Sequence, residues 1–203
     1  MGMYLQLAAV SDATIARLQA DPPLVWQLVT PDEPDRVAAA RAESQPRPGL
    51  LSRLFGAGAS PQLAPAPPPL ELGPGEGDLG VLGDFEKSWH GLHYLLTGTA
   101  WEGAPPLNFL LAGGHELDIE LGQAPVRAYT SAETRSIATA LAARTTEELR
   151  ARFNPTEMMQ LEIYPEIWER PEEPDDLVDA LGQLRETLDT VVGRGYGLVV
   201  IIT

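Results

Sequence analysis

The last six residues of the sequence, L-V-V-I-I-T from Leu198 to Thr203, constrain the fold more than any other stretch. The apolar residues in this run do not alternate with polar ones, which is typical of a strand buried on both faces at the centre of a sheet. A central strand needs neighbours, and the apolar run from Met3 to Val10 is the natural candidate because it also lacks helical spacing. The sequence therefore predicts an α+β fold, in which a small sheet including the N- and C-terminal strands is covered by helices.

The segment before the terminal strand has the clearest helical pattern in the chain. From Asp175 to Val192, apolar residues recur at steps of four, three, four and three, at Leu177, Leu181, Leu184, Leu188 and Val191. This spacing places them along one face of a helix, and such a face must pack on another part of the protein.

Capping signals locate the other helices. Ser11 is a suitable N-cap, Thr130 and Glu133 have the spacing of a capping box, and Asn154 is followed by proline at the first helical position. Gly98 ends a further helical pattern. Together with the apolar spacing, these signals predict helices or helical turns over residues 12–20, 23–29, 84–97, 130–143, 145–152 and from 155 onward, and a short strand over residues 126–129.

A segment rich in proline and glycine interrupts this order. From Pro46 to Gly77, 14 of 32 residues are proline or glycine, so regular helix or sheet is not expected there. The segment is predicted to be an insertion at the surface of a single domain that spans residues 1–203. Within it, residues 49–56 contain an apolar cluster with helical spacing, which either folds back onto the domain or docks on a partner: Leu50, Leu51, Leu54 and Phe55.

Composition excludes several classes of function. The 29 acidic and 14 basic residues give a formal charge of −15, which disfavours binding to nucleic acid or to an anionic membrane. The sequence contains no cysteine, so it has no thiolate nucleophile and no cysteine metal ligand. The N-terminus lacks the basic region of a signal peptide and is too short in apolar length to span a bilayer, so a cytoplasmic protein is expected.

Two of the three histidines lie three residues apart beside a tryptophan. His90 and His93 are close enough on one helix face to bind a metal together with His115, Glu116 or Asp118. The H-G-L-H pattern, however, lacks the spacing and the intervening glutamate of catalytic zinc helices. We therefore expect His93 to be a buried hydrogen-bonding residue beside Trp89 and His90 to be more exposed, with no metal and no cofactor.

Acidic residues are concentrated in the last third of the chain. Between Glu147 and Asp189 there are 13 acidic and 4 basic residues, a local charge of −9. Such a surface can steer a basic partner, or it can simply keep the protein soluble. The acidic pairs at the start of the long helix are the candidates to face a partner: Glu172, Glu173, Asp175 and Asp176.

Four motifs in order resemble those of one family. They are the opening M-G-M, W-x-x-L-H-x-x-L-T-G from Trp89 to Gly98, P-L-x-x-x-L-A-G-G from Pro106 to Gly114, and I-Y-P-x-x-W from Ile163 to Trp168. Together they resemble the YfbM-like family of bacterial proteins, a domain-of-unknown-function family, along nearly the whole chain apart from the proline-rich segment. The resemblance implies a compact, cytoplasmic α+β domain and assigns no catalytic residue.

Two hypotheses for function follow. The first is a non-enzymatic protein-binding module, such as an immunity protein that neutralises a basic toxin domain through electrostatic steering. The second is a small-molecule-binding protein or enzyme, with a pocket between Trp89, His93, Tyr164 and Trp168. No nucleophile elbow and no glycine-rich phosphate-binding loop is present to favour the second.

Overall fold

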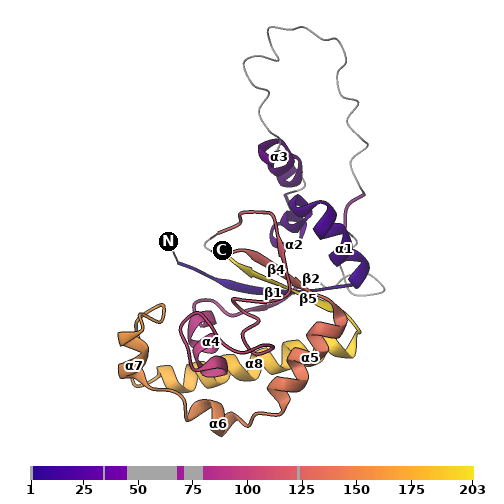
Figure 1. Ribbon diagram of the computed structural model, residues 1–203. Helices are drawn as coiled ribbons and strands as arrows, with labels where there is room; N and C mark the ends of the chain where they lie inside the picture. The colour runs from indigo at the N-terminus through magenta and orange to yellow at the C-terminus, as the bar shows by residue number, and fades with distance from the viewer. Residues whose placement is uncertain (1, 34, 45–67, 71–79, 123) are drawn as a thin grey trace, which may run out of the picture.

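The computed structural model describes residues 2–33, 35–44, 68–70, 80–122 and 124–203 (Figure 1). Its elements follow one another as β1 (Leu5–Val10), α1 (Asp12–Ala20), the 3₁₀ turn η1 (Pro22–Val25), α2 (Trp26–Val29), α3 (Asp35–Ser44), β2 (Gly80–Asp84), α4 (Trp89–Thr97), β3 (His115–Leu117), β4 (Val126–Tyr129), α5 (Ser131–Ala142), α6 (Thr146–Arg150), α7 (Pro155–Gln160), α8 (Glu173–Gly193) and β5 (Gly197–Ile202). None of the helices in the described ranges is both long enough and apolar enough to cross a membrane.

The five strands form one antiparallel sheet in the order β2-β1-β5-β4-β3. The C-terminal strand β5 lies at its centre, and every residue of β5 is buried. It pairs with β1 along the whole length of both strands, from Leu5 opposite Ile202 to Val10 opposite Gly197. The predicted α+β fold, with a sheet that includes both terminal strands, is therefore confirmed.

Helices cover both faces of this sheet (Figure 1). Leu198, Val200 and Ile202 point into a core shared with α4, α5 and α8, which we call the lower core. Val199 and Ile201 point the other way, into a core shared with α1, η1 and α2, which we call the upper core. Successive residues of a strand face opposite sides of the sheet, so the absence of polar alternation in β5 follows from the presence of a core on each side.

The capping residues act as the sequence predicts. Ser11 Oγ accepts a hydrogen bond from the Thr14 backbone N–H at the start of α1. Thr130 and Glu133 form a complete capping box at the start of α5, and Asn154 caps α7. The apolar stripe of α8 is buried in full against the lower core.

The predicted helix over residues 84–97 is shorter than expected. Asp84 is the last residue of β2, which pairs with β1, and α4 begins only at Trp89. Between them, the Asp84 side chain accepts a hydrogen bond from the Glu86 N–H, and Glu86 has a φ of +45°. A left-handed residue breaks a right-handed helix, so the chain turns here before α4 can form.

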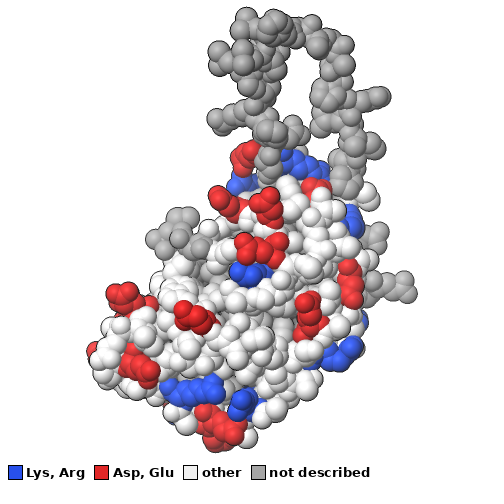
Figure 2. Space-filling view, viewed as in Figure 1, with Lys and Arg blue, Asp and Glu red and all other residues white. Residues whose placement is uncertain are grey.

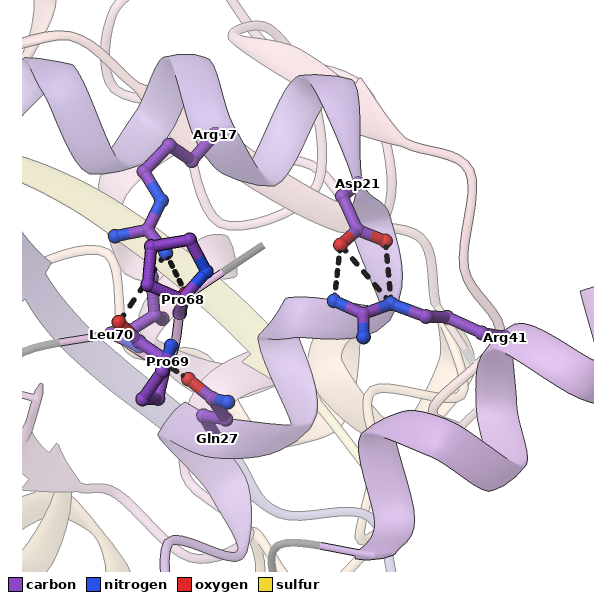
Figure 3. Close-up of polar contacts among 7 residues, drawn as sticks. All are labelled: Arg17, Asp21, Gln27, Arg41, Pro68, Pro69 and Leu70. Carbon is purple, nitrogen blue, oxygen red and sulfur yellow. Dashed lines mark hydrogen bonds and ion pairs between the residues drawn. The ribbon is translucent and has the colours of Figure 1, made fainter. Parts of the chain in front are cut away.

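Most of the proline-rich segment, including Leu50, Leu51, Leu54 and Phe55, lies outside the described residues. Pro68 to Leu70 are described, and Leu70 belongs to the upper core (Figure 3). Arg17 donates to the carbonyl oxygens of Pro68 and Pro69, and the Leu70 N–H donates to Gln27 Oε1 at 2.6 Å. Leu70 is only 8% exposed, so this part of the predicted insertion belongs to a core.

Candidate functional site

Helix α4 is the most deeply buried helix of the described fold. Every residue from Trp89 to Leu96 is buried, because α8, α6 and the chain that follows Gly98 surround the helix. Gly91 is required for this packing: a Cβ atom there would lie 2.4 Å from the Trp168 indole ring. The histidines of α4 are therefore held in an environment from which water is excluded.

His90 is fully buried, so the expectation of an exposed His90 is wrong. The chain reverses at Gly98, and this places the Ala100 carbonyl oxygen 2.8 Å from His90 Nε2. His90 Nδ1 accepts a hydrogen bond from the Tyr164 N–H at 3.0 Å, so the proton is on Nε2. The imidazole also stacks on the Trp89 ring with a centroid distance of 4.6 Å. Burial lowers the pKa of His90 below its usual value.

His93 is a buried hydrogen-bonding residue, as its position beside Trp89 predicts. Its Nε2 lies 2.8 Å from the Glu102 carbonyl oxygen, which requires the proton on Nε2. Burial, more than any other cause, lowers the pKa of His93 to about 4. Both imidazoles are therefore neutral at pH 7, and neither is a general base tuned to that pH.

The residues weighed as metal ligands are not brought together. His115 and Glu116 lie on β3, at the edge of the sheet, and Glu116 pairs with Arg127 at 3.2 Å. Among the described residues, no group of three or more histidine or acidic side chains is placed to hold a metal ion.

The four candidate pocket residues are neighbours that fill space. The Trp89 and Tyr164 rings lie 6.0 Å apart, and Trp168 packs on α4 at Gly91. Trp89, His93 and Trp168 are all buried, whereas Tyr164 is half-buried. The Tyr164 hydroxyl accepts a hydrogen bond from the Met3 N–H at 3.1 Å and so connects the site to the N-terminal segment. None of these side chains lines any of the grooves described below.

The four candidate acidic residues at the start of α8 have different environments. Glu172, Asp175 and Asp176 are exposed, and Asp175 pairs with Arg150 at 2.7 Å. Glu173 is buried and does not face solvent, which corrects its assignment as a partner-facing residue. Burial, together with the neighbouring Asp176 carboxylate, raises the pKa of Glu173.

A groove next to this helix start collects carboxylates from two parts of the chain. It encloses about 310 Å³ between α8 and the turn after β2, and we call it the acidic groove. Its lining residues are Asp84, Phe85, Glu86, Ser88, Asp176, Asp179, Ala180 and Gln183. None of its four carboxylates forms an ion pair within the described part of the chain.

The walls of the acidic groove are fixed by the fold. Asp84 ends a strand that pairs with β1, and the Gln183 side chain on α8 donates to the Asp84 carbonyl oxygen at 3.3 Å. Asp176 and Asp179 lie one helical turn apart on α8 and so face the same side. The sequence pattern identified Asp176 only, because Asp84 and Glu86 were expected on a helix and not at the end of a strand. Figure 2 shows further acidic side chains in separate patches on this face of the molecule, with basic side chains among them.

The arrangement defines a class: an α+β protein with a central antiparallel sheet, a buried aromatic and histidine cluster, and an acidic surface groove. Residues 1–200 match the family described as Domain of unknown function (DUF1877), and the chain belongs to that family. The predicted resemblance to YfbM-like proteins is thereby confirmed.

A solved structure, described as a protein of unknown function YfbM from Escherichia coli, covers 100% of both chains with 18% identity and a TM-score of 0.56. At this identity the likeness shows the fold alone. A comparison with curated proteins finds no match.

Proposed function

We propose that this protein is a non-enzymatic protein-binding module, and that its acidic groove receives basic side chains of a partner protein. An immunity protein that neutralises a basic toxin domain would act in this way. The observation that supports the proposal is the convergence of four carboxylates on one hollow, none of them paired with a cation of the described chain.

The geometry of the groove suits a guanidinium or ammonium group. Asp176 and Asp179 provide acceptors from one wall, and Asp84 and Glu86 provide them from the other. An arginine side chain has five N–H donors in a planar fork and is recognised by carboxylates placed around it. The formal charge of −15 would raise the association rate with a basic partner through long-range attraction.

The groove is also organised before a partner binds. Its walls rest on a paired strand and on a helix whose apolar stripe is buried, so little ordering entropy remains to be lost on association. A small-molecule pocket at the aromatic and histidine cluster lacks comparable support, because Trp89, His93 and Trp168 are buried in the core and line none of the grooves.

The test uses two double variants of the same helix. Asp176→Asn with Asp179→Asn removes two charges from the groove. Glu186→Gln with Asp189→Asn removes two exposed charges, at the same spacing, from a part of α8 outside the groove. Both double variants remove two negative charges from the same helix. A difference in partner binding between them therefore reports on the groove and not on net charge.

We expect a tagged protein to recover a basic protein from its native cell, with a salt-dependent affinity. The groove variant should weaken that affinity by about tenfold or more, since hydrogen bonds to charged groups contribute about 1.5–3 kcal/mol. The control variant should change it far less. Recovery of no basic partner, or equal effects of the two variants in a binding titration, would contradict the proposal.

A further inference from the structure

A second groove has the opposite chemistry. It encloses about 550 Å³ between the ends of α4 and α5 and the loop at residues 104–107, and we call it the arginine groove. Its lining residues are Leu96, Thr97, Ala104, Pro105, Pro106, Leu107, Ala140, Ala143, Arg144 and Arg152. It shares no lining residue with the acidic groove.

The lining of the arginine groove contains no acidic residue, although 29 of the 203 residues are acidic. Each of the other four grooves considered in the described fold has at least one carboxylate in its wall, such as Glu116, Glu133, Asp176 or Glu43. The groove is therefore a local exception to the charge of the protein.

Arg152 is held in place by a helix end. Its Nη1 donates to the carbonyl oxygens of Leu95 and Leu96, at 2.8 and 2.7 Å, in the last turn of α4. Carbonyl groups at the C-terminus of a helix favour a cation but do not neutralise it as a carboxylate would. Arg152 has no ion-pair partner in the described residues, so its positive charge remains available to the groove.

Arg144 is anchored through its backbone and not through its side chain. Arg185 donates to the carbonyl oxygens of Leu141 and Arg144, at 2.9 and 2.8 Å, and thereby fixes the end of α5. Within the described ranges, the Arg144 guanidinium has neither a hydrogen bond nor an ion pair. It is exposed at the groove and has five free N–H donors.

Apart from Thr97, the other lining residues are leucine, proline and alanine. We infer that the arginine groove binds a small organic anion, in which an apolar body lies on Leu107 and the prolines and a single anionic head group contacts Arg144 and Arg152. The volume lies within the usual range of small-molecule sites, about 300–1,000 Å³. A planar guanidinium binds a carboxylate, phosphate or sulfonate through paired hydrogen bonds, which accounts for the choice of head group.

The first test measures the binding of 8-anilinonaphthalene-1-sulfonate, a fluorescent probe with an aromatic body and one anionic group. The variant Arg144→Gln removes the free guanidinium from the groove, and Arg135→Gln removes an exposed arginine from α5 outside it. We expect saturable binding to the unaltered protein, about tenfold weaker binding to Arg144→Gln, and little change for Arg135→Gln.

A second pair of variants adds a charge instead of removing one. Ala143→Glu places a carboxylate in the wall of the groove, whereas Ala142→Glu places one on the neighbouring exposed residue outside the lining. Both variants put a negative charge near the C-terminal end of α5, so both should lose a similar amount of stability. A difference in probe binding between them then comes from the groove. Ala143→Glu should abolish probe binding, and Ala142→Glu should retain it.

Displacement of the probe identifies the ligand chemistry. Octanoate should displace it, octanamide should do so at least tenfold less well, and inorganic phosphate alone should displace it poorly because it lacks an apolar body. Absence of saturable binding, equal displacement by octanoate and octanamide, or equal effects within either pair of variants would overturn the inference. The acidic groove is unchanged in all four variants, so this result is independent of partner binding.

Discussion

The two sides of the central sheet are completed in different ways. The lower core is closed mainly by α4, α5 and the 21-residue helix α8, and the apolar stripe of α8 can be read directly as a periodic pattern. The upper core is closed by short helical segments and by Leu70, which comes from a segment dominated by proline and glycine. The comparison shows that a residue can belong to a core without any local periodicity, if hydrogen bonds such as that from the Leu70 N–H to Gln27 hold its backbone in place.

The largest expected effect comes from removing the strand that both cores share. Deletion of Leu198 to Ile202 removes five buried apolar side chains, each contributing roughly 1.5–3 kcal/mol through burial. The free energy of unfolding of a domain is typically about 5–15 kcal/mol, so the truncated chain should not fold. Soluble expression and circular dichroism show whether the truncated chain folds. A truncated protein that still unfolds cooperatively would show that the two cores do not depend on β5.

Leu70 tests the upper core alone. Leu70→Ala should lower the free energy of unfolding by about 2–5 kcal/mol, the usual range for a buried leucine. Leu82→Ala is the matched control, because Leu82 is 37% exposed and should contribute much less. Denaturant unfolding measures both. Equal effects would mean that Leu70 only covers the surface.

The same residue divides the proline-rich segment into two parts. Replacement of residues 46–67 by a short Gly/Ser linker should have little effect, since loop-closure free energy changes by only about 0.6 kcal/mol for each doubling of length. Replacement of residues 46–77 also removes Pro68, Pro69 and Leu70, and should therefore destabilise the protein as Leu70→Ala does.

Much of the fold could be predicted because its signals are local. The apolar run of β5, the stripe of α8 and the caps at Ser11, Thr130 and Asn154 each depend on residues close in sequence. Strand β2 was missed because its sequence, G-V-L-G-D, contains two glycines and no alternation. Its strand conformation depends on hydrogen bonds to β1, about seventy residues earlier in the chain.

The candidate site was harder to predict for the same reason. The sequence places Asp176 on an exposed helix start, but the opposite wall of the acidic groove comes from Asp84 and Glu86, whose position depends on β2. Likewise, the burial of His90 depends on the reversal of the chain at Gly98, which brings the Ala100 carbonyl oxygen to His90 Nε2. A helix face alone does not show what a later segment will cover.

The buried histidines provide a test of the lower core. His90→Ala and His93→Ala should each lower the free energy of unfolding by on the order of 1–3 kcal/mol, because each removes a fully buried imidazole that is hydrogen-bonded to the backbone. An exposed His90, as the sequence predicts, would contribute little, whereas the buried His90 of the structure should contribute as much as His93. A small effect at His90 in thermal or denaturant unfolding would contradict the observed hydrogen bonds.

The histidines also make the stability of the lower core depend on pH. Because the pKa of His93 is lowered from 6.5 to about 4 in the folded protein, the unfolded chain binds the proton more readily between these values. The contribution of neutral, buried His93 to the free energy of unfolding is therefore fully present above pH 6.5. It is lost as the pH falls towards 4. His93→Gln should flatten this part of the stability profile, and an unchanged profile would show that other groups control the acid response.

The smallest effect is expected at the ion pair that attaches α3 to the upper core. Arg41 Nε lies 3.2 Å from both oxygens of Asp21, and the two side chains remain 26% and 21% exposed (Figure 3). Ion pairs near the surface contribute about 0.2–1 kcal/mol, so Arg41→Gln should lower the global free energy of unfolding by no more than that.

Arg36, whose guanidinium lies 4.2 Å from the centre of the Trp26 ring, and the buried Val37 would still hold the helix. The variant should therefore increase amide hydrogen exchange in α3 while exchange in β5 stays unchanged, because local opening of α3 does not require the sheet to unfold. Faster exchange in β5 as well would show that α3 and the sheet unfold as one cooperative unit, and that the upper core depends on this helix as strongly as on Leu70.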